Sequence, residues 1–196
     1  MILYLHGFRS SPQSFKAGLL AQAVHEAGHG DAWCCPQLPP SPRRAHELAT
    51  RLINQRVQQG MNPQRDLVVV GSSLGGYYAT CLAETWHCRA VLLNPVVHAA
   101  RDLATQVGEH TMWNSPERFE FLPEYVDELA EMAVGRPADP SRYYLLAAKG
   151  DELLDWREMV EWYEGCELRL LEGSDHGISD FRDWLPEVLE RVLPRP

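Results

Sequence analysis

An apolar run that breaks into a glycine-rich turn constrains this chain more than any other stretch of its sequence. Leu67–Val70 predicts a buried strand, residues 71–75 have the sequence Gly-Ser-Ser-Leu-Gly, and residues 77–84 carry a helical pattern. A strand, a Gly-x-Ser-x-Gly turn and a helix in this order are typical of a nucleophile elbow, in which a serine lies strained at the apex of a tight turn. The pattern therefore predicts that Ser73 is a nucleophile and that Ser72 is only its neighbour.

The glycines around Ser73 have a steric explanation. A side chain at Gly71 or Gly75 would collide with the helix or the strand, and Gly76 is expected to let the helix approach the sheet closely. A chance match is a weak alternative, because about 0.05 such pentapeptides are expected in a chain of this composition. Two phosphate-binding loops are excluded as well. The sequence has no Gly-x-Gly-x-x-Gly motif, and no Lys-Ser or Lys-Thr pair follows the glycines.

Length, composition and charge indicate one soluble domain. The chain has 196 residues, of which 45% are hydrophobic, so we expect a single domain over residues 1–196. No apolar stretch approaches the roughly 20 residues needed to cross a bilayer. The N-terminus lacks the basic segment of a signal peptide, and residues 2–5 predict a strand instead. With a net charge of −9 and scattered arginines, the chain is not expected to bind nucleic acid or a membrane.

The cysteines indicate a reducing compartment. Their number, five, is odd, and none of them has Cys-x-x-Cys spacing. This argues against a disulfide framework and against a zinc site, and it predicts a cytoplasmic protein without a bound metal.

The first predicted strand leads into a His-Gly-Phe loop. Serine hydrolases with a nucleophile elbow place one oxyanion donor in such a loop. We therefore expect the backbone N–H groups of Phe8 and of Leu74, the residue after the nucleophile, to form an oxyanion hole. His6 is expected to brace the loop and not to act as a base. Residues 11–27 predict a helix that starts with Ser-Pro.

Predicted strands and helices alternate along the rest of the chain. The pattern predicts strands at 31–35, 90–93, 143–148 and 168–171, and helices at 42–59 and 180–192. Residues 36–42 contain four prolines, and they form either a wall of the substrate pocket or an ordinary rigid turn.

Residues 96–140 differ in character from the rest of the chain. They show no strand pattern, and helical fragments at 99–107 and 123–134 predict a small helical cap inserted after the fourth strand. Seven acidic residues lie between positions 117 and 139, against two arginines. These charges predict that the cap disfavours polyanionic substrates such as acyl-CoA, although an ordinary solvated acidic face explains them equally well.

Two loops after predicted strands supply the candidates for the catalytic acid residue and the general base. Asp151 lies just beyond the strand at 143–148, where a carboxylate is able to orient a histidine. Asp155, the alternative, is placed to cap the next helix. His176 lies on a glycine-flanked loop after the last strand, and it is the best general base among the eight histidines.

The order of these residues identifies the fold. Ser73, Asp151 and His176 follow one another in the sequence Ser–acid–His, which distinguishes the α/β-hydrolase fold from the chymotrypsin and subtilisin arrangements. The alternation of strands and helices predicts a compact version of this fold. We expect a mostly parallel sheet of about six strands with helices on both faces.

The motifs together resemble the small bacterial α/β-hydrolase esterases of the YqiA/YcfP type. The likeness runs nearly end to end, through His-Gly-Phe at 6–8, Ser-Ser-Pro at 10–12, Pro-Gln-Leu-Pro-Pro at 36–40, residues 71–80, Asn94-Pro95, residues 150–155 and His176-Gly177. The resemblance implies Ser73 as nucleophile, His176 as base, Asp151 as acid, and esterase activity on short acyl esters.

A serine esterase acting on a small-molecule ester is therefore the expected function. The reaction needs neither a metal nor an organic cofactor. Thioester hydrolysis or acyl transfer by the same triad is one alternative, and a non-catalytic hydrolase fold that binds an acyl ligand or a protein partner is another. The sequence does not specify an oligomeric state.

Overall fold

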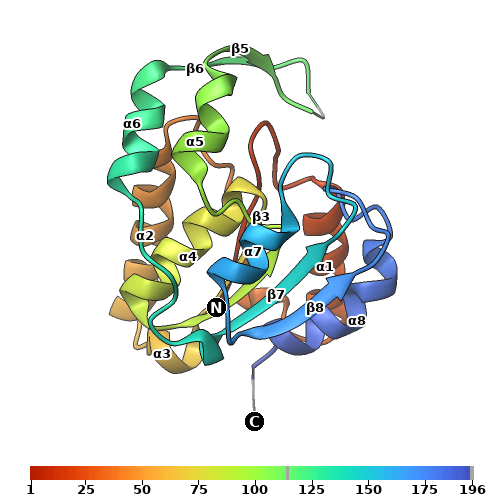
Figure 1. Cartoon of the computed structure of the whole chain (residues 1–196). Helices are drawn as coiled ribbons and strands as arrows, with labels where there is room; N and C mark the ends of the chain where they lie inside the picture. Colours follow the sequence, from red (N-terminus) through yellow and green to blue (C-terminus); the bar gives the residue numbers. More distant parts are fainter. Residues whose placement is uncertain (114, 195–196) are drawn as a thin grey trace.

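A six-stranded parallel sheet forms the centre of the computed structural model, which describes residues 1–113 and 115–194 (Figure 1). Its strand order is β2-β1-β3-β4-β7-β8, and every neighbouring pair is parallel. The strands are β1 (Ile2–Leu5), β2 (Trp33–Cys34), β3 (Val68–Ser72), β4 (Arg89–Leu93), β7 (Tyr143–Ala148) and β8 (Glu167–Leu171). The predicted sheet is confirmed.

Helices cover both faces of this sheet (Figure 1). On one face, α1 (Phe15–Glu26) packs beside α8 (Phe181–Val192). The other face carries α2 (Pro42–Gln58), α4 (Leu74–Trp86) and α7 (Trp156–Trp162). Two short elements, α3 (Pro63–Asp66) and η3 (Pro140–Arg142), precede β3 and β7. Within the described residues, no helix is long and apolar enough to cross a membrane.

The core has two halves, one on each face of the sheet. In β1, Leu3 and Leu5 belong to the cluster under α2 and α4, whereas Ile2 and Tyr4 belong to the cluster under α1 and α8. Successive side chains of a strand point to opposite faces, so a strand buried on both sides has to be apolar throughout. This is why β1 and β7 appear in the sequence as continuous apolar runs, whereas the more exposed edge strand β8 also contains Glu167 and Arg169.

Two predicted boundaries near the N-terminus are wrong. The first helix, α1, begins at Phe15 and not at residue 12, because the Ser11 carbonyl accepts a hydrogen bond from the amide three residues on (3.0 Å) and closes a separate turn first. The second strand, β2, is shorter than 31–35. A 3₁₀ turn, η1 (Gly30–Ala32), takes up the first residues of that stretch.

The segment between β4 and β7 differs from the wholly helical cap that the sequence predicted. Two helical pieces, α5 (Ala99–Leu103) with η2 (Ala104–Gln106) and α6 (Pro123–Glu131), flank an antiparallel pair of strands, β5 (Gly108–Thr111) and β6 (Arg118–Phe121). The expected absence of strands between residues 96 and 140 is therefore wrong. Each strand has only four residues, too few for its alternating pattern to stand out. Figure 1 shows α5, β5, β6 and α6 together in the upper part of the molecule.

Candidate active site

Ser73 lies in the turn between β3 and α4. Its φ of 55° is in the left-handed region, which a residue other than glycine rarely adopts. Three backbone hydrogen bonds hold this conformation. The Ser73 N–H donates to the Leu93 carbonyl (3.1 Å), and the Ser73 carbonyl accepts from the amides of Gly76 (2.8 Å) and Val96 (3.0 Å). The end of β4 therefore fixes the strained serine, as such a conformation requires.

The turn closes because glycines flank it. A Cβ atom on Gly71 would lie 2.3 Å from the carbonyl oxygen of Gly75, and one on Gly75 would lie 1.9 Å from that of Leu5. A Cβ atom on Gly76 would lie 2.5 Å from Cβ of Pro95. All three separations are shorter than real contacts, and the predicted steric role of Gly71 and Gly75 is confirmed. Gly76 makes room for the loop after β4.

Two hydrogen bonds connect Ser73, His176 and Asp151. Nε2 of His176 lies 3.0 Å from Oγ of Ser73, and Nδ1 lies 2.8 Å from Oδ2 of Asp151. The three residues follow β3, β8 and β7, so their side chains meet at the carboxyl-terminal edge of the sheet. A carboxylate only accepts hydrogen bonds, so Nδ1 carries the proton and Nε2 is free to accept the serine proton. This geometry suits a general base beside a nucleophile.

Asp151 presents one oxygen to the histidine. Its side chain is completely buried, and Oδ1 accepts hydrogen bonds from the amides of Leu153 and Leu154, both at 2.9 Å. These bonds leave Oδ2 for His176. The His176 side chain is 17% exposed. A molecule in the site is therefore able to reach the imidazole while the carboxylate behind it stays shielded from water.

Three other carboxylates near the site bind backbone groups. Asp155 caps α7 by accepting from an amide of its first turn (2.9 Å), as predicted. Asp175 accepts from the amide of Ser179 (2.8 Å) within its own loop. Glu152, to which the sequence assigned no role, accepts from the backbone N–H of His176 (3.0 Å). Glu152 thus anchors the loop between β8 and α8 that carries His176, here called the histidine loop, without touching the imidazole.

Asn94 ties the histidine loop to the sheet. Its fully buried side chain donates from Nδ2 to the carbonyls of Asp175 and His176, each at 3.0 Å, and accepts at Oδ1 from the amide of Ala148 (2.8 Å). One side chain therefore joins β4, β7 and the loop after β8. Sequence reasoning missed this role, for which the only signal was a polar Asn-Pro pair directly after a buried strand.

Lys16 holds the same loop from α1. Its Nζ donates a hydrogen bond to the carbonyl of Gly177 at 2.6 Å. Burial lowers the pKa of Lys16 to about 8, and the nearby carboxylates of Asp175 and Asp151 act in the opposite direction. In its charged form, the ammonium group places a positive charge near the buried Asp151.

The two predicted oxyanion residues lie beside Ser73. Leu74 is the first residue of α4, so its amide has no intrahelical acceptor. Gly7, which precedes Phe8, is so near that a Cβ atom on it would lie 3.1 Å from Cβ of Ser73. In the described part of the chain, the Phe8 amide has no hydrogen-bond acceptor. Both amides are therefore available to an oxyanion, and their role as its donors stays a prediction.

His6 braces the loop that carries Phe8, as predicted. Its ring is buried, Nε2 accepts from the amide of Leu38 (3.0 Å), and Nδ1 lies 3.1 Å from the carbonyl of Gly7. An amide only donates, so Nε2 carries no proton and Nδ1–H donates to the carbonyl. Burial lowers the pKa of His6, which favours this neutral form.

The strands β5 and β6 dock on the same loop. The ring of Phe8 makes edge contacts with His110, Phe119 and Phe121, with centroids 5.0 to 5.6 Å apart. Arg9 donates to the carbonyl of Thr111 (2.8 Å). The residue expected to supply an oxyanion amide therefore also supports the cap through its side chain.

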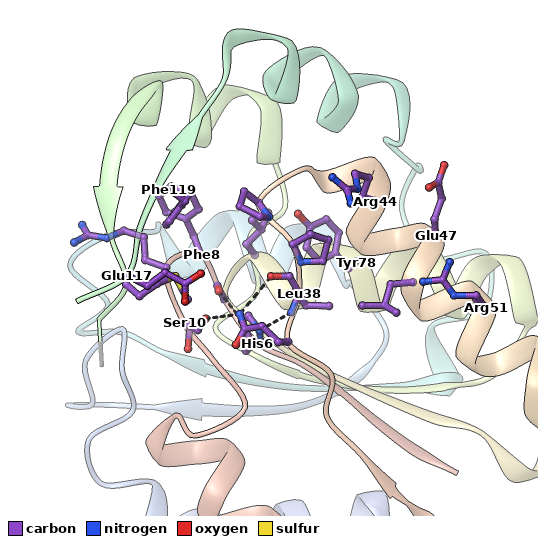
Figure 2. Close-up of a pocket in the computed structure, with 18 residues that line it drawn as sticks. His6, Phe8, Ser10, Leu38, Arg44, Glu47, Arg51, Tyr78, Glu117 and Phe119 are labelled. Carbon is purple, nitrogen blue, oxygen red and sulfur yellow. Dashed lines mark hydrogen bonds between the residues drawn. The ribbon is translucent and has the colours of Figure 1, made fainter. Parts of the chain in front are cut away.

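A cavity of about 490 Å³ lies beside this loop (Figure 2). Its lining includes Phe8 and Leu74 but neither Ser73 nor His176, so it adjoins the oxyanion side of the site. Four residues of the proline-rich loop, at 37–40, line it, so this loop forms a wall of the cavity. Of the seven acidic residues between 117 and 139, Glu117 alone lines this cavity. Whether the acidic cap repels polyanions stays a prediction.

Within residues 1–113 and 115–194, no three histidine, cysteine or acidic side chains lie together in a way that would hold a metal ion. The groups that the structure brings together at Ser73 are a hydroxyl, an imidazole and a carboxylate. Their arrangement is able to move a proton and to form a covalent bond through the serine oxygen.

Comparison with known proteins agrees with this architecture. The sequence profile of a family described as "Uncharacterised protein family (UPF0227)" matches residues 1–191. Among solved structures, alpha/beta hydrolase domain-containing protein 10 from mouse is similar with a TM-score of 0.67 and 15% identity, over 98% of this chain and 90% of that one.

Two similar structures are those of esterases. Est1E from Butyrivibrio proteoclasticus has a TM-score of 0.64 and 12% identity, over 96% of this chain and 85% of that one. An esterase from Pyrococcus furiosus has a TM-score of 0.60 and 15% identity, over 97% of this chain and 79% of that one. At these identities the likeness establishes the fold alone. The predicted α/β-hydrolase fold is confirmed.

The contacts of Asn94 lead to a prediction about the site. In Asn94→Asp, a carboxylate oxygen replaces the Nδ2 donor and faces the carbonyls of Asp175 and His176, so the loop should shift and misplace the imidazole. We expect labelling of Ser73 by a fluorophosphonate probe to slow by at least tenfold. The control is Asn54→Asp, which adds the same charge to an exposed position of α2. Equal labelling rates in the two variants would contradict the assigned role.

Proposed function

The chain belongs to the uncharacterised protein family UPF0227, the YqiA/YcfP-type family that its motifs resemble, and we propose that it is a serine esterase. Its substrates would be short-chain carboxylic esters, hydrolysed through an acyl-enzyme. The observation that carries this proposal is the hydrogen-bonded chain from Ser73 through His176 to Asp151. The likeness of the fold to two esterases gives further support.

In the first half of the proposed reaction, Ser73 attacks the ester carbonyl. As the serine oxygen bonds to carbon, Nε2 of His176 takes its proton, and the buried Asp151 stabilises the resulting imidazolium. The carbonyl oxygen becomes an oxyanion that accepts hydrogen bonds from the amides of Phe8 and Leu74. Such preformed donors each lower the barrier by about 3 kcal/mol. The imidazolium then returns the proton to the departing alkoxide, and the alcohol leaves.

In the second half, water hydrolyses the acyl-enzyme. His176 takes a proton from the water, the hydroxide adds to the acyl carbon, and the same two amides stabilise the new oxyanion. The carbon–Ser73 bond then breaks, His176 protonates the serine oxygen, and the carboxylic acid is released. Thioester hydrolysis or acyl transfer would use the same groups with another leaving group or acceptor. A protein that only binds a ligand would have no need for a hydrogen-bonded chain of serine, histidine and aspartate.

The proposal extends to the setting of the enzyme. A cytoplasmic location is supported by the five cysteines, which are free thiols in the described structure. The proposed partner is a small-molecule ester. Nucleic acids and anionic membranes are not proposed as partners, because the chain carries a net charge of −9 and would be repelled by them.

Hydrolysis of a para-nitrophenyl ester series from acetyl to palmitoyl tests this proposal. We expect the purified protein to show its highest kcat/KM on the short esters, the preference that its resemblance to the YqiA/YcfP-type esterases implies. Ser73→Ala should lose the activity, because the nucleophile is gone. Turnover that survives in Ser73→Ala, or none in either protein, would contradict a serine esterase. A maximum at long chains would contradict the short-chain preference.

A second prediction separates the two acidic candidates. Asp151→Asn should lower kcat by about 10³- to 10⁴-fold, because an amide donates to Nδ1 and favours the wrong tautomer of His176. Asp155→Asn removes a charge of the same sign four residues away and keeps a side chain able to cap α7, so kcat should change less than about threefold. Steady-state kinetics on the best short ester measures both. A larger loss in Asp155→Asn would overturn the assignment.

A further inference from the structure

The cavity beside the oxyanion residues has two distinct ends (Figure 2). Phe8 lines one end, and Arg44, Glu47 and Arg51 of α2 line the other, while Leu74, the residue after Ser73, also contributes to the lining. Leu38 and Tyr78 lie between these ends and contribute apolar surface to a lining that also contains polar side chains such as Gln37. A substrate that fills this cavity would therefore present its middle portion to Leu38 and Tyr78 and its far end to α2.

The α2 end of the cavity carries two arginines. Arg44 and Arg51 are seven residues apart, which is about two helical turns, so both lie on the face of α2 that lines the cavity. Figure 2 shows them with Glu47 on one side of the cavity, opposite Phe8 and Glu117.

These two guanidinium groups lack ionic partners. In residues 1–113 and 115–194, neither the Arg44 nor the Arg51 side chain forms a hydrogen bond or an ion pair. Their neighbour Arg43, by contrast, pairs with Glu131 of α6 at 2.5 Å. Arg44 and Arg51 are therefore free to bind an anion.

The charge balance of the lining indicates how much negative charge the cavity accepts. Three arginines, at positions 9, 44 and 51, face two glutamates, at positions 47 and 117, which leaves one net positive charge. Arg9 is already engaged with the carbonyl of Thr111 and the ring of Trp113. The lining thus suits a single negative charge near Arg44 and Arg51 better than a polyanion.

The position of His176 decides which part of an ester enters this cavity. In the proposed reaction, His176 protonates the leaving alcohol, so the alcohol lies against the imidazole. No described residue of the loop from 174 to 178 lines the cavity. The alcohol therefore leaves on the His176 side, and the acyl group extends past Phe8 and Leu74 into the cavity.

We propose that the preferred substrates are esters whose acyl chain ends in a carboxylate, that is, monoesters of dicarboxylic acids. This inference rests on the proposed esterase function and names its substrate class. Arg44 and Arg51 bind the terminal carboxylate through charged hydrogen bonds, which are stronger than neutral ones. Leu38 and Tyr78 contact the methylene groups between the two ends.

Two esters of equal chain length test the inference. Para-nitrophenyl hexanoate and mono-para-nitrophenyl adipate share leaving group and length, and differ in the terminal carboxylate. Their kcat/KM values are compared in the wild type, in Arg44→Gln/Arg51→Gln, and in Arg43→Gln/Arg56→Gln. The last variant removes the same charge from α2 at two positions outside the cavity lining.

We expect the adipate-to-hexanoate ratio to fall about tenfold in Arg44→Gln/Arg51→Gln, mainly through KM, and to stay at the wild-type value in the control. An unchanged ratio in the first variant would overturn the inference. An equal fall in the control would overturn it too, because net charge alone would then explain the selectivity.

A binding measurement keeps this inference separate from the esterase proposal. Calorimetry on Ser73→Ala compares monomethyl adipate with methyl hexanoate, with and without the arginine substitutions. If the wild type hydrolyses neither nitrophenyl ester, the esterase proposal fails, and binding alone decides the inference. Tighter binding of monomethyl adipate that depends on Arg44 and Arg51 supports it, and equal affinities for the two esters contradict it.

Discussion

The proposed chemistry depends on the hydrogen bond between Nε2 of His176 and Oγ of Ser73, which joins two groups 103 residues apart in sequence. The parallel sheet makes this bond achievable, because it brings the carboxyl ends of β3, β7 and β8 to one edge. A shared edge alone does not hold catalytic side chains within about 0.5 Å of their productive positions, so further contacts are needed. Backbone hydrogen bonds from β4 fix the serine, and Asn94, Glu152 and Lys16 bind backbone groups of the histidine loop.

Sequence reasoning recovered the features that have a local signature. Buried strands are apolar throughout, a nucleophile elbow needs glycine at fixed positions, and Ser41 with Pro42 marks the start of α2. It missed features that depend on contacts between distant segments. The role of Asn94 exists only because β7 and the histidine loop lie beside it. The strands β5 and β6 have four residues each, and they pack through aromatic rings on Phe8, a residue about a hundred positions earlier.

The cap and the site are coupled through one short loop. Phe8 carries a proposed oxyanion amide on its backbone and supports β6 with its ring. His6, two residues earlier, binds the amide of Leu38 in the proline-rich loop that forms a wall of the cavity. The position of the oxyanion donors and the shape of the cavity therefore depend on the same few contacts, so substitutions in this loop should alter turnover and substrate preference together.

The central claim is that Ser73 forms a covalent acyl-enzyme, and trapping that species tests it most directly. The protein would be mixed with para-nitrophenyl acetate, quenched in acid within the first turnover, digested and analysed by mass spectrometry. We expect one added acetyl group on Ser73, and none on Ser73 when His176 is replaced by alanine. An acetyl group on Ser72 or on another side chain, or ester hydrolysis with no adduct on Ser73, would contradict it.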